Sequence, residues 1–259
     1  KFMARIVVKV GSNVLTRDNG KLDITRMSAL VDQIVWLRNK GYEVILVSSG
    51  AVAAGKGELH TNHHLDSVEQ RQLFSAIGQV KLVGLYYNLF REYGVKIGQV
   101  LTMKENFEDG EQYRNQKACM EVMLENNVIP IVNENDTVCI TELMFTDNDE
   151  LSGLIARMMR AERLVLLTNV NGIYDGDPAN ERTKVIRTVA YDGDVSEYVS
   201  KEKSSKGRGG MLSKLKTAQQ VARQGIRVVI ANGNIPGILQ KLEEDKEGTE
   251  HTEFVPCLK

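Results

Sequence analysis

Six short runs of apolar, mostly β-branched residues recur along the chain, and both faces of each run are apolar. They are RIVVKV (5–10), EVILVS (43–48), VKIGQVL (95–101), NVIPIV (127–132), RLVLLT (163–168) and IRVVIA (226–231). Strands that are apolar on both faces are typical of a parallel sheet covered by helices on each side. These runs therefore predict the buried strands of one sheet.

Segments with helical periodicity lie between these runs. Apolar side chains recur every three or four residues from Ile24 to Leu37, from Leu151 to Met158 and from Met211 to Ala222. The alternation predicts an α/β fold with a mostly parallel central sheet sandwiched between helices. Ligands of such sheets bind beyond the carboxyl ends of the strands, so the residues after each strand are the candidates for function.

Composition limits the possible partners and the compartment. The chain has 33 Lys and Arg residues against 34 acids, a net charge of -1, so it has no basic field to attract nucleic acid or anionic lipid. Its three cysteines, Cys119, Cys139 and Cys257, are far apart and indicate reduced thiols. The sequence shows no signal peptide or membrane span. We predict a cytoplasmic protein without a nucleic-acid or membrane partner.

The first strand ends in KVGSN, with Lys9 near the end of the strand and Gly11 and Ser12 directly after it. A glycine lets backbone N–H groups approach a phosphate, and a nearby ammonium neutralises its charge. The common nucleotide-binding fingerprints are absent. A surface lysine beside a turn glycine explains the same residues, so both readings stay open.

The second strand is followed by SSGAVAAGKG, with Ser48, Ser49 and Gly50 ahead of a helix start rich in small residues. Hydroxyls and free amides at this position can bind an anion or a carboxylate. An N-cap without any ligand is the alternative.

The fourth strand leads into NENDTVCITELMFTDNDELSG, residues 133–153. Asp147 and Glu150 are explained as the cap and first turn of the next helix. No such explanation covers the four residues Asn133, Glu134, Asn135 and Asp136, since polar residues directly after a buried strand must meet water or a ligand. Acids bind a metal ion or an ammonium, and amides orient a carboxylate. A ligand with both an ammonium and a carboxylate is an amino acid.

Two further candidates lie in the last hundred residues. Thr168, Asn169 and Tyr174 follow the fifth strand, where a polar turn is the simpler reading. In GRGGMLSKLK (207–216), Lys214 lies in the first turn of a helix, where a cation is unfavourable for stability, so an anion explains it better than the fold does. The polar, Gly-rich segment 193–210 ahead of that helix is a candidate lid.

Together these segments resemble the amino acid kinase family. The resemblance runs in order over essentially the whole chain, through IVVKVGSNVLT, VSSGAVAAG, LFSAIGQV, NENDTV, DNDELSG, LLTNVNGIYDGDP, GGMLSKL and GTEHTEF. The NENDTV and DNDELS pair with SSGAVAAG is similar to those members that phosphorylate glutamate. The resemblance implies a carbamate-kinase-like fold and transfer of a phosphoryl group from ATP, with Mg²⁺, to the side-chain carboxylate of glutamate, which is the first step of proline synthesis.

The family resemblance also implies roles for individual residues. Lys9 and Lys214 would supply positive charge, Asp149 would position both lysines, and Gly11 and Ser12 would hold phosphates. Glutamate would be bound by Ser49, Gly50, Asn133, Asp136 and Asn148, with Asp136 facing its ammonium. The nucleotide would be bound by Lys9, Gly11, Ser12, Thr168, Asn169, Tyr174, Arg208, Gly209, Gly210, Met211 and Lys214, and no residue is assigned to a metal. The family usually has aspartate in place of Asn169 and threonine in place of Arg208.

We expect one kinase domain over residues 1–259, with the amino-acid side in the N-terminal part and the nucleotide side from about residue 150. The resemblance further implies a homo-oligomer inhibited by proline, and a chain without the RNA-binding-like (PUA) domain found at the C-terminus of many members. Two alternatives remain open. One is a family member that phosphorylates acetylglutamate or a nucleoside monophosphate, and the other is a non-catalytic sensor of glutamate or proline, which would not need Lys9, Lys214 and Asp149.

Overall fold

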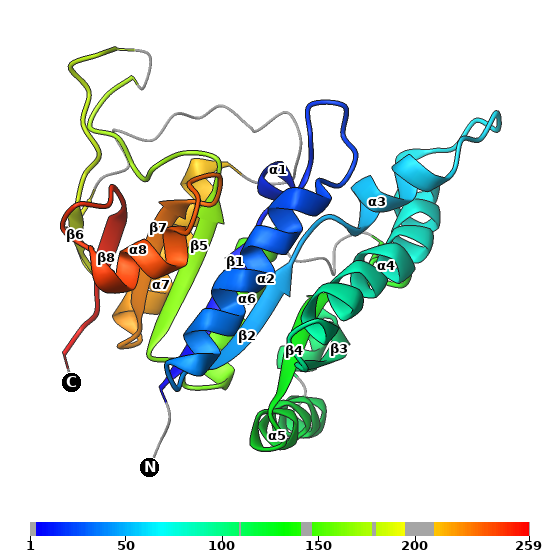
Figure 1. Cartoon of the computed structure of the whole chain (residues 1–259), viewed down its shortest axis with the longest axis horizontal. Helices are drawn as coiled ribbons and strands as arrows, with labels where there is room; N and C mark the ends of the chain where they lie inside the picture. The colour runs from blue at the N-terminus through cyan, green and yellow to red at the C-terminus, as the bar shows by residue number, and fades with distance from the viewer. Residues whose placement is uncertain (1–3, 109, 141–146, 178–179, 195–209, 259) are drawn as a thin grey trace.

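A computed structural model describes residues 4–108, 110–140, 147–177, 180–194 and 210–258 (Figure 1). Its eight-stranded sheet has the order β3-β4-β2-β1-β5-β7-β8-β6. The strands are β1 (Arg5–Val10), β2 (Glu43–Ser48), β3 (Lys96–Thr102), β4 (Val128–Glu134), β5 (Arg163–Thr168), β6 (Thr188–Ala190), β7 (Arg227–Asn232) and β8 (Thr252–Val255). All pairings are parallel except that of β7 with β8. The predicted α/β class is confirmed.

Helices cover both faces of this sheet. They are α1 (Ser12–Leu15), α2 (Ile24–Asn39), α3 (Ala51–Glu58), α4 (Ser67–Arg91), α5 (Gly110–Glu125), α6 (Asn148–Met158), α7 (Met211–Arg223) and α8 (Ile238–Glu244), with a 3₁₀ helix η1 at Lys104–Phe107. Core residues of α2, α4 and α8 form one apolar cluster with the sheet. Those of α5, α6 and α7 form a second cluster on the opposite face. The sheet is therefore the middle of three layers, as Figure 1 shows.

The register of β1 places one lysine among apolar side chains. Ile6, Val8 and Val10 belong to the cluster on the α2 side, whereas Val7 belongs to the cluster on the α6 side. Because side chains alternate along a strand, Lys9 points to the same face as Val7. Lys9 pairs in register with Val47 and Leu166 of the neighbouring strands. Its ammonium consequently emerges near the carboxyl edge of the sheet, beneath α6.

The six strands expected from the sequence begin and end within two residues of the observed ones. β6 and β8 were not expected. β6 spans only Thr188–Ala190, and β8 carries the buried polar residues Thr252 and Glu253, which interrupt the apolar pattern that identifies a strand. Most of the candidate lid, residues 195–209, lies outside the described residues.

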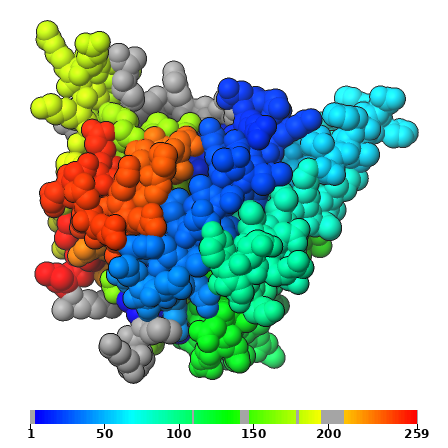
Figure 2. Space-filling view, in the orientation of Figure 1, coloured from blue at the N-terminus to red at the C-terminus, as the bar shows by residue number. Residues whose placement is uncertain are grey.

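Two glycines let α3 and α4 pack in backbone contact. A Cβ atom added at Gly55 would lie 1.8 Å from the carbonyl oxygen of Phe74, and one at Gly78 would lie 1.6 Å from that of Ala51. Both distances are far below any allowed contact, so only glycine fits at either position. The two helices form the side of the molecule opposite to α8 and β8, cyan to green in Figure 2.

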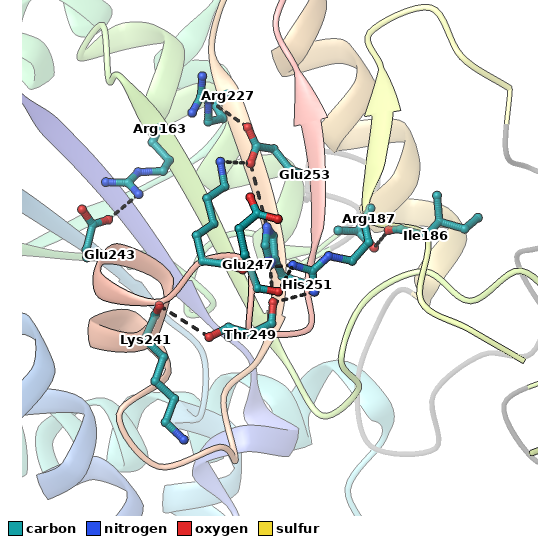
Figure 3. A network of polar contacts seen from close by, with 12 residues as sticks. Arg163, Ile186, Arg187, Arg227, Lys241, Glu243, Glu247, Thr249, His251 and Glu253 are labelled. Atoms are coloured by element: carbon teal, nitrogen blue, oxygen red, sulfur yellow. Dashed lines mark hydrogen bonds and ion pairs between the residues drawn. The ribbon is translucent and has the colours of Figure 1, made fainter.

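A polar network holds the segment between α8 and β8 (Figure 3). The guanidinium of Arg187 donates hydrogen bonds to the carbonyls of Lys246, Glu247 and Thr249. Glu253 on β8 forms ion pairs with Arg227 and Lys246. These contacts tie the outer strands β6 and β8 to the rest of the sheet. No helix within the described ranges combines the length and the apolarity needed to cross a membrane.

Candidate functional site

A cavity of about 300 Å³ opens at the carboxyl ends of β1, β2, β4 and β5. Its walls come from these strand ends, from the first turns of α1, α3, α6 and α7, and from α4. The lining residues are Lys9, Gly11, Ser12, Asn13, Val14, Ser49, Gly50, Ala51, Val52, Arg71, Asn133, Glu134, Asp136, Asp147, Asn148, Asp149, Leu167, Thr168 and Lys214. Eleven of them belong to the set predicted from the sequence: Lys9, Gly11, Ser12, Ser49, Gly50, Asn133, Asp136, Asn148, Asp149, Thr168 and Lys214.

Two lysines share one carboxylate in this cavity. The Nζ atom of Lys9 lies 2.8 Å from Oδ1 of Asp149, and the Nζ atom of Lys214 lies 3.0 Å from Oδ2 of the same residue. The side chains come from β1, α6 and α7. Asp149 is 1% exposed. The carboxylate therefore holds two ammonium groups next to each other. This cluster forms only when β1, α6 and α7 come together.

The protonation of Asp149 follows from two opposing effects. Burial by itself raises the pKa of the Asp149 carboxyl, but the charges of Lys9 and Lys214 outweigh burial and hold the pKa below its usual value. Asp149 is consequently ionised at neutral pH. The cluster of two ammonium groups and one carboxylate carries a net charge of about +1.

Side-chain amides connect the other strand ends. Nδ2 of Asn148 donates to Oγ of Ser49 at 2.8 Å and to Oδ1 of Asn133 at 3.0 Å. Oδ1 of Asn133 also accepts from the Glu134 backbone N–H at 2.9 Å. This network holds hydroxyl and amide groups of β4, α6 and the β2–α3 junction around one side of the cavity.

A left-handed glycine aims Ser49 into the cavity. Gly50 has φ +107, a value that L side chains rarely adopt, and it is the N-cap of α3. The turn at Gly50 allows β2 to pass directly into α3. On the other side, the Nζ atom of Lys9 lies 3.3 Å from the place where a Cβ of Gly11 would be. The α1 backbone thus approaches the lysine ammonium closely, next to first-turn N–H groups that have no partner within a helix.

Asp147 lies beside the lysine cluster as the N-cap of α6. Its Oδ1 accepts from the Glu150 backbone N–H at 3.0 Å, as expected from the sequence, and its Oδ2 accepts a short hydrogen bond from Ser213 of α7. Burial, and then the charge of Asp149, raise the pKa of the Asp147 carboxyl. The cap therefore also joins the amino ends of α6 and α7.

Arg71 is a cavity residue that the sequence did not reveal. Its Nε atom lies 3.2 Å from Oδ1 of Asp136, and its Nη2 donates a short hydrogen bond to the Cys139 carbonyl. Burial raises the pKa of the neighbouring Cys139 thiol to about 11, so this thiol is not reactive at neutral pH. Arg71 lies in the polar first turns of α4, where the sequence resembles any solvent-facing helix start.

Asn13 and Glu134 line the cavity as well.

Four residues expected on the nucleotide side do not line the cavity. Asn169 is exposed beside Thr168, Tyr174 forms a bridge with Val185, and Gly210 is the N-cap of α7. Met211 packs against the apolar cluster on the α6 side. Arg208 and Gly209 lie outside the described residues. Throughout the described ranges, no group of three or more His, Cys, Asp or Glu side chains could hold a metal ion.

Comparison with known proteins agrees with this architecture. Residues 4–232 match the model of the amino acid kinase family. A glutamate 5-kinase from Bacteroides thetaiotaomicron is 59% identical over 97% of this chain and 70% of its own length. A glutamate 5-kinase from Chlorobaculum tepidum is 47% identical over 95% of this chain and 68% of its own length.

Solved structures of low sequence identity share the fold. Carbamate kinase from Giardia lamblia bound to AMP-PNP is 14% identical, with a TM-score of 0.69 over 98% of this chain and 99% of its own. UMP kinase from Ureaplasma parvum is 15% identical, with a TM-score of 0.63 over 98% of this chain and all of its own. The sheet order, the cavity at the strand ends and these similarities lead to one conclusion: the chain belongs to the amino acid kinase family.

Proposed function

We propose that this chain transfers the γ-phosphoryl group of ATP to the side-chain carboxylate of L-glutamate, giving L-glutamyl 5-phosphate and ADP. This reaction is the first step of proline biosynthesis. The proposal is supported by the identity with glutamate 5-kinases over nearly the whole chain. It is also supported by the chemistry of the cavity.

One observation carries the proposal. A single cavity combines two ammonium groups held by Asp149 with a separate set of amides, hydroxyls and the carboxylate of Asp136. The lysine cluster suits phosphate oxygens, because an array of fixed cations stabilises the charge of a transferring phosphoryl group. The second set suits an amino acid, with Asn133, Asn148 and Ser49 around a carboxylate and Asp136 near an ammonium.

The reaction needs positioning and charge rather than a general base. A glutamate side chain, with an ordinary pKa of about 4.3, is already ionised at neutral pH. Its carboxylate oxygen forms a bond to the γ-phosphorus while the bond from that phosphorus to the β,γ-bridging oxygen breaks. The electron pair of the broken bond stays on ADP, and no proton moves. The main obstacle is repulsion between anions, which Lys9 and Lys214 reduce.

Asp149 acts through the two lysines in this mechanism. Without its carboxylate the two ammonium groups would repel each other and turn apart. With it, both ammonium groups stay directed at the same place. Asp149 is therefore a positioning residue.

Mg²⁺ would enter with the nucleotide. Both carboxylate oxygens of Asp149 are already within 3.0 Å of a lysine, and the described residues offer no three-ligand metal site. Mg²⁺ in kinases is held largely by substrate phosphates and water. The side chains present fit an ion carried by ATP, which would neutralise phosphate charge, and we assign no residue of this chain to hold it.

The proposal assigns one part of the chain to each substrate. Ser49, Gly50, Asn133, Asp136 and Asn148 precede residue 150 and would bind glutamate within one kinase domain. From about residue 150 onward, Thr168, Asn169, Tyr174, Arg208, Gly209, Gly210 and Met211 would contact the nucleotide, together with Lys9, Gly11, Ser12 and Lys214. The ADP produced would leave from this second side.

Three further expectations extend the proposal. Proline, which carries an ammonium and a carboxylate on one carbon as glutamate does, would compete for the amino-acid site. Copies of the chain would associate, which light scattering can measure. The reaction would take place in the cytoplasm, where the three free cysteines stay reduced.

An assay that traps the acyl phosphate tests the function. With ATP, Mg²⁺ and hydroxylamine, we expect γ-glutamyl hydroxamate to form with glutamate, and ADP release to depend on glutamate. Acetylglutamate and a nucleoside monophosphate serve as rival acceptors. If either rival is phosphorylated faster than glutamate, that rival, and not glutamate, is the preferred substrate. Binding of glutamate without any ADP release would identify a sensor.

A further inference from the structure

Arg71 gives the cavity a third positive charge. Among the described lining residues, Lys9 and Lys214 bind Asp149, and Arg71 is the one cation outside that cluster. Its side chain is 18% exposed and that of Asp136, its ion-pair partner, is 12% exposed. Two opposite charges are thus held, largely shielded from water, on the wall of the cavity.

The charges of the substrate show why such a pair is useful. An amino acid with an acidic side chain carries three charges: the reacting carboxylate, the α-ammonium and the α-carboxylate. The lysine cluster faces the first, and Asp136 complements the second. The amides of Asn133 and Asn148 can orient the α-carboxylate, but they carry no charge to balance it. Desolvating a carboxylate without a cation is unfavourable.

An ion pair can bind an amino acid without coming apart. The ammonium and the carboxylate of an α-amino acid are attached to the same carbon, so they form a compact dipole. Nε of Arg71 and Oδ1 of Asp136, 3.2 Å apart, form another. Laid antiparallel, each charge of the substrate would face the opposite charge of the protein.

We propose that Arg71 binds the α-carboxylate of the amino-acid substrate while Asp136 binds its ammonium, so that the two together select an α-amino acid. This inference rests on the proposed function, since it assigns the α-carboxylate of glutamate. Arg71 is a specificity-determining residue on this account. It acts away from the transferred phosphoryl group.

Arg71 also holds the loop formed by residues 135–140. If this were its whole role, replacing Arg71 would affect all amino-acid substrates alike and would not change the preference among them. Its Nη2 donates to the Cys139 carbonyl, and Nε2 of Gln72 donates to the Thr137 carbonyl at 2.9 Å. Gln72 therefore restrains the same loop from the same helix. It carries no charge and does not line the cavity, which makes it a matched control for loop position.

The test compares glutamate with isoglutamine, whose α-carboxylate is replaced by a neutral amide while the reacting carboxylate and the ammonium remain. Acyl phosphate formation is trapped with hydroxylamine, and kcat/KM is obtained for both acceptors. We expect the wild type to prefer glutamate by roughly 10²-fold, the scale of one buried charge contact. Arg71→Gln should reduce this preference to about 5-fold or less, mainly by lowering kcat/KM for glutamate.

Three comparisons complete the test. Arg71→Lys should keep much of the preference, because the charge remains although the planar fork is lost. Gln72→Leu should keep the wild-type preference. The preference of Arg71→Gln for glutamate over glutarate, which lacks the ammonium, should persist because Asp136 is intact.

Two results would overturn the inference. If Arg71→Gln slows glutamate and isoglutamine by the same factor, Arg71 only positions the loop. An Arg71→Gln protein in which the kcat/KM values for both acceptors equal those of the wild type would exclude any contact with the α-carboxylate. A wild type that transfers no phosphoryl group to glutamate would instead refute the proposed function, whatever the Arg71 variants do.

Discussion

The Nζ atom of Lys214 lies 3.0 Å from Oδ2 of Asp149, which joins the first turn of α7 to the first turn of α6. A cation at the amino end of a helix opposes the helix dipole. Here the buried carboxylate at the amino end of the neighbouring helix compensates for it. The pair explains how the fold tolerates Lys214 at a position that its own helix disfavours.

Replacing Lys214 tests the charge that the mechanism requires. We expect Lys214→Met to lower kcat by roughly 10²–10³, the loss typical of one transition-state donor. Lys214→Arg should recover only part of this, because a planar guanidinium cannot replace a compact ammonium. Steady-state kinetics at saturating glutamate and ATP measure both. A near-normal kcat in Lys214→Met would exclude the proposed role.

The same variant should also be less stable. From the helix dipole alone, losing this charge would leave stability unchanged or raise it by about 0.3–1 kcal/mol. The structure reverses that expectation, because Asp149 is 1% exposed and would keep only Lys9 as its cation. We expect a loss of about 1–3 kcal/mol in the free energy of unfolding, measured in urea. Equal stability of variant and wild type would show that Lys9 alone is enough to compensate the buried negative charge of Asp149.

Asp136→Asn removes the carboxylate assigned to the substrate ammonium while keeping a similar shape. We expect KM for glutamate to rise by about 10-fold or more, and KM for ATP to change by less than about 2-fold. Arg71 would lose its ionic partner in this variant. A comparable rise in both KM values would place Asp136 outside the amino-acid site.

Gly78→Ala tests the backbone contact between α3 and α4. The new methyl group would lie 1.6 Å from the Ala51 carbonyl oxygen, so the helices must separate. We expect a loss of about 3 kcal/mol or more in stability, and weaker glutamate binding because Ser49 and Gly50 precede α3. Gly84→Ala on the same helix is the control, since no atom lies within 4 Å of its added Cβ. Thermal unfolding should show Gly84→Ala equal to the wild type or up to about 1 kcal/mol more stable.

Glu253 should make stability depend on acid pH. The polar contact with His251, whose Nε2 lies 3.9 Å from Oε2 of Glu253, and then the contacts with Lys246 and Arg227, lower the pKa of Glu253 to about 2 from an ordinary value of 4.5 (Figure 3). A lowered pKa in the folded state stabilises the fold above the unfolded pKa, and this contribution disappears as the pH falls from about 4.5 to about 2.

The corresponding variant is Glu253→Gln. It should cost up to about 3 kcal/mol of unfolding free energy at pH 7 and progressively less below pH 4.5. Glu247→Gln, in the same segment but exposed, is the matched control. Urea unfolding of the three proteins at pH 7 and near pH 3 measures the difference. If the difference in unfolding free energy between wild type and Glu253→Gln does not become smaller at low pH, the lowered pKa of Glu253 is contradicted.

Much of the fold and the grouping of the site could be predicted because both depend on local patterns. Runs such as RIVVKV are apolar on both faces, which few structures other than a covered parallel strand allow. Once the strands are parallel, the residues at and just beyond their carboxyl ends meet at one edge, so Lys9, Ser49 and Asn133 lie around one cavity. Their chemical roles remain predictions.

What could not be predicted depends on tertiary packing. Arg71 reaches the Cys139 carbonyl across 68 residues of sequence, and its place in the cavity depends on the close packing of α3 and α4. Nothing in the polar turn SVEQRQ distinguishes Arg71 from a surface residue. In β8, Thr252 and Glu253 can be buried because the backbone N–H of Ile173 donates to the Thr252 hydroxyl and Arg227 pairs with the Glu253 carboxylate. A hydrophobic pattern in the sequence does not reveal such partners.

The shared carboxylate of Asp149 also bears on the order of folding. Lys214 follows Asp149 by 65 residues, and Lys9 precedes it by a still longer stretch of chain. Contacts between residues so distant in sequence require long loops to close, so they form slowly compared with local helices. During refolding, far-ultraviolet circular dichroism should therefore recover before phosphoryl transfer. Catalytic activity would thus report completed folding, and a fragment that lacks either β1 or α7 would fold helices without gaining any activity.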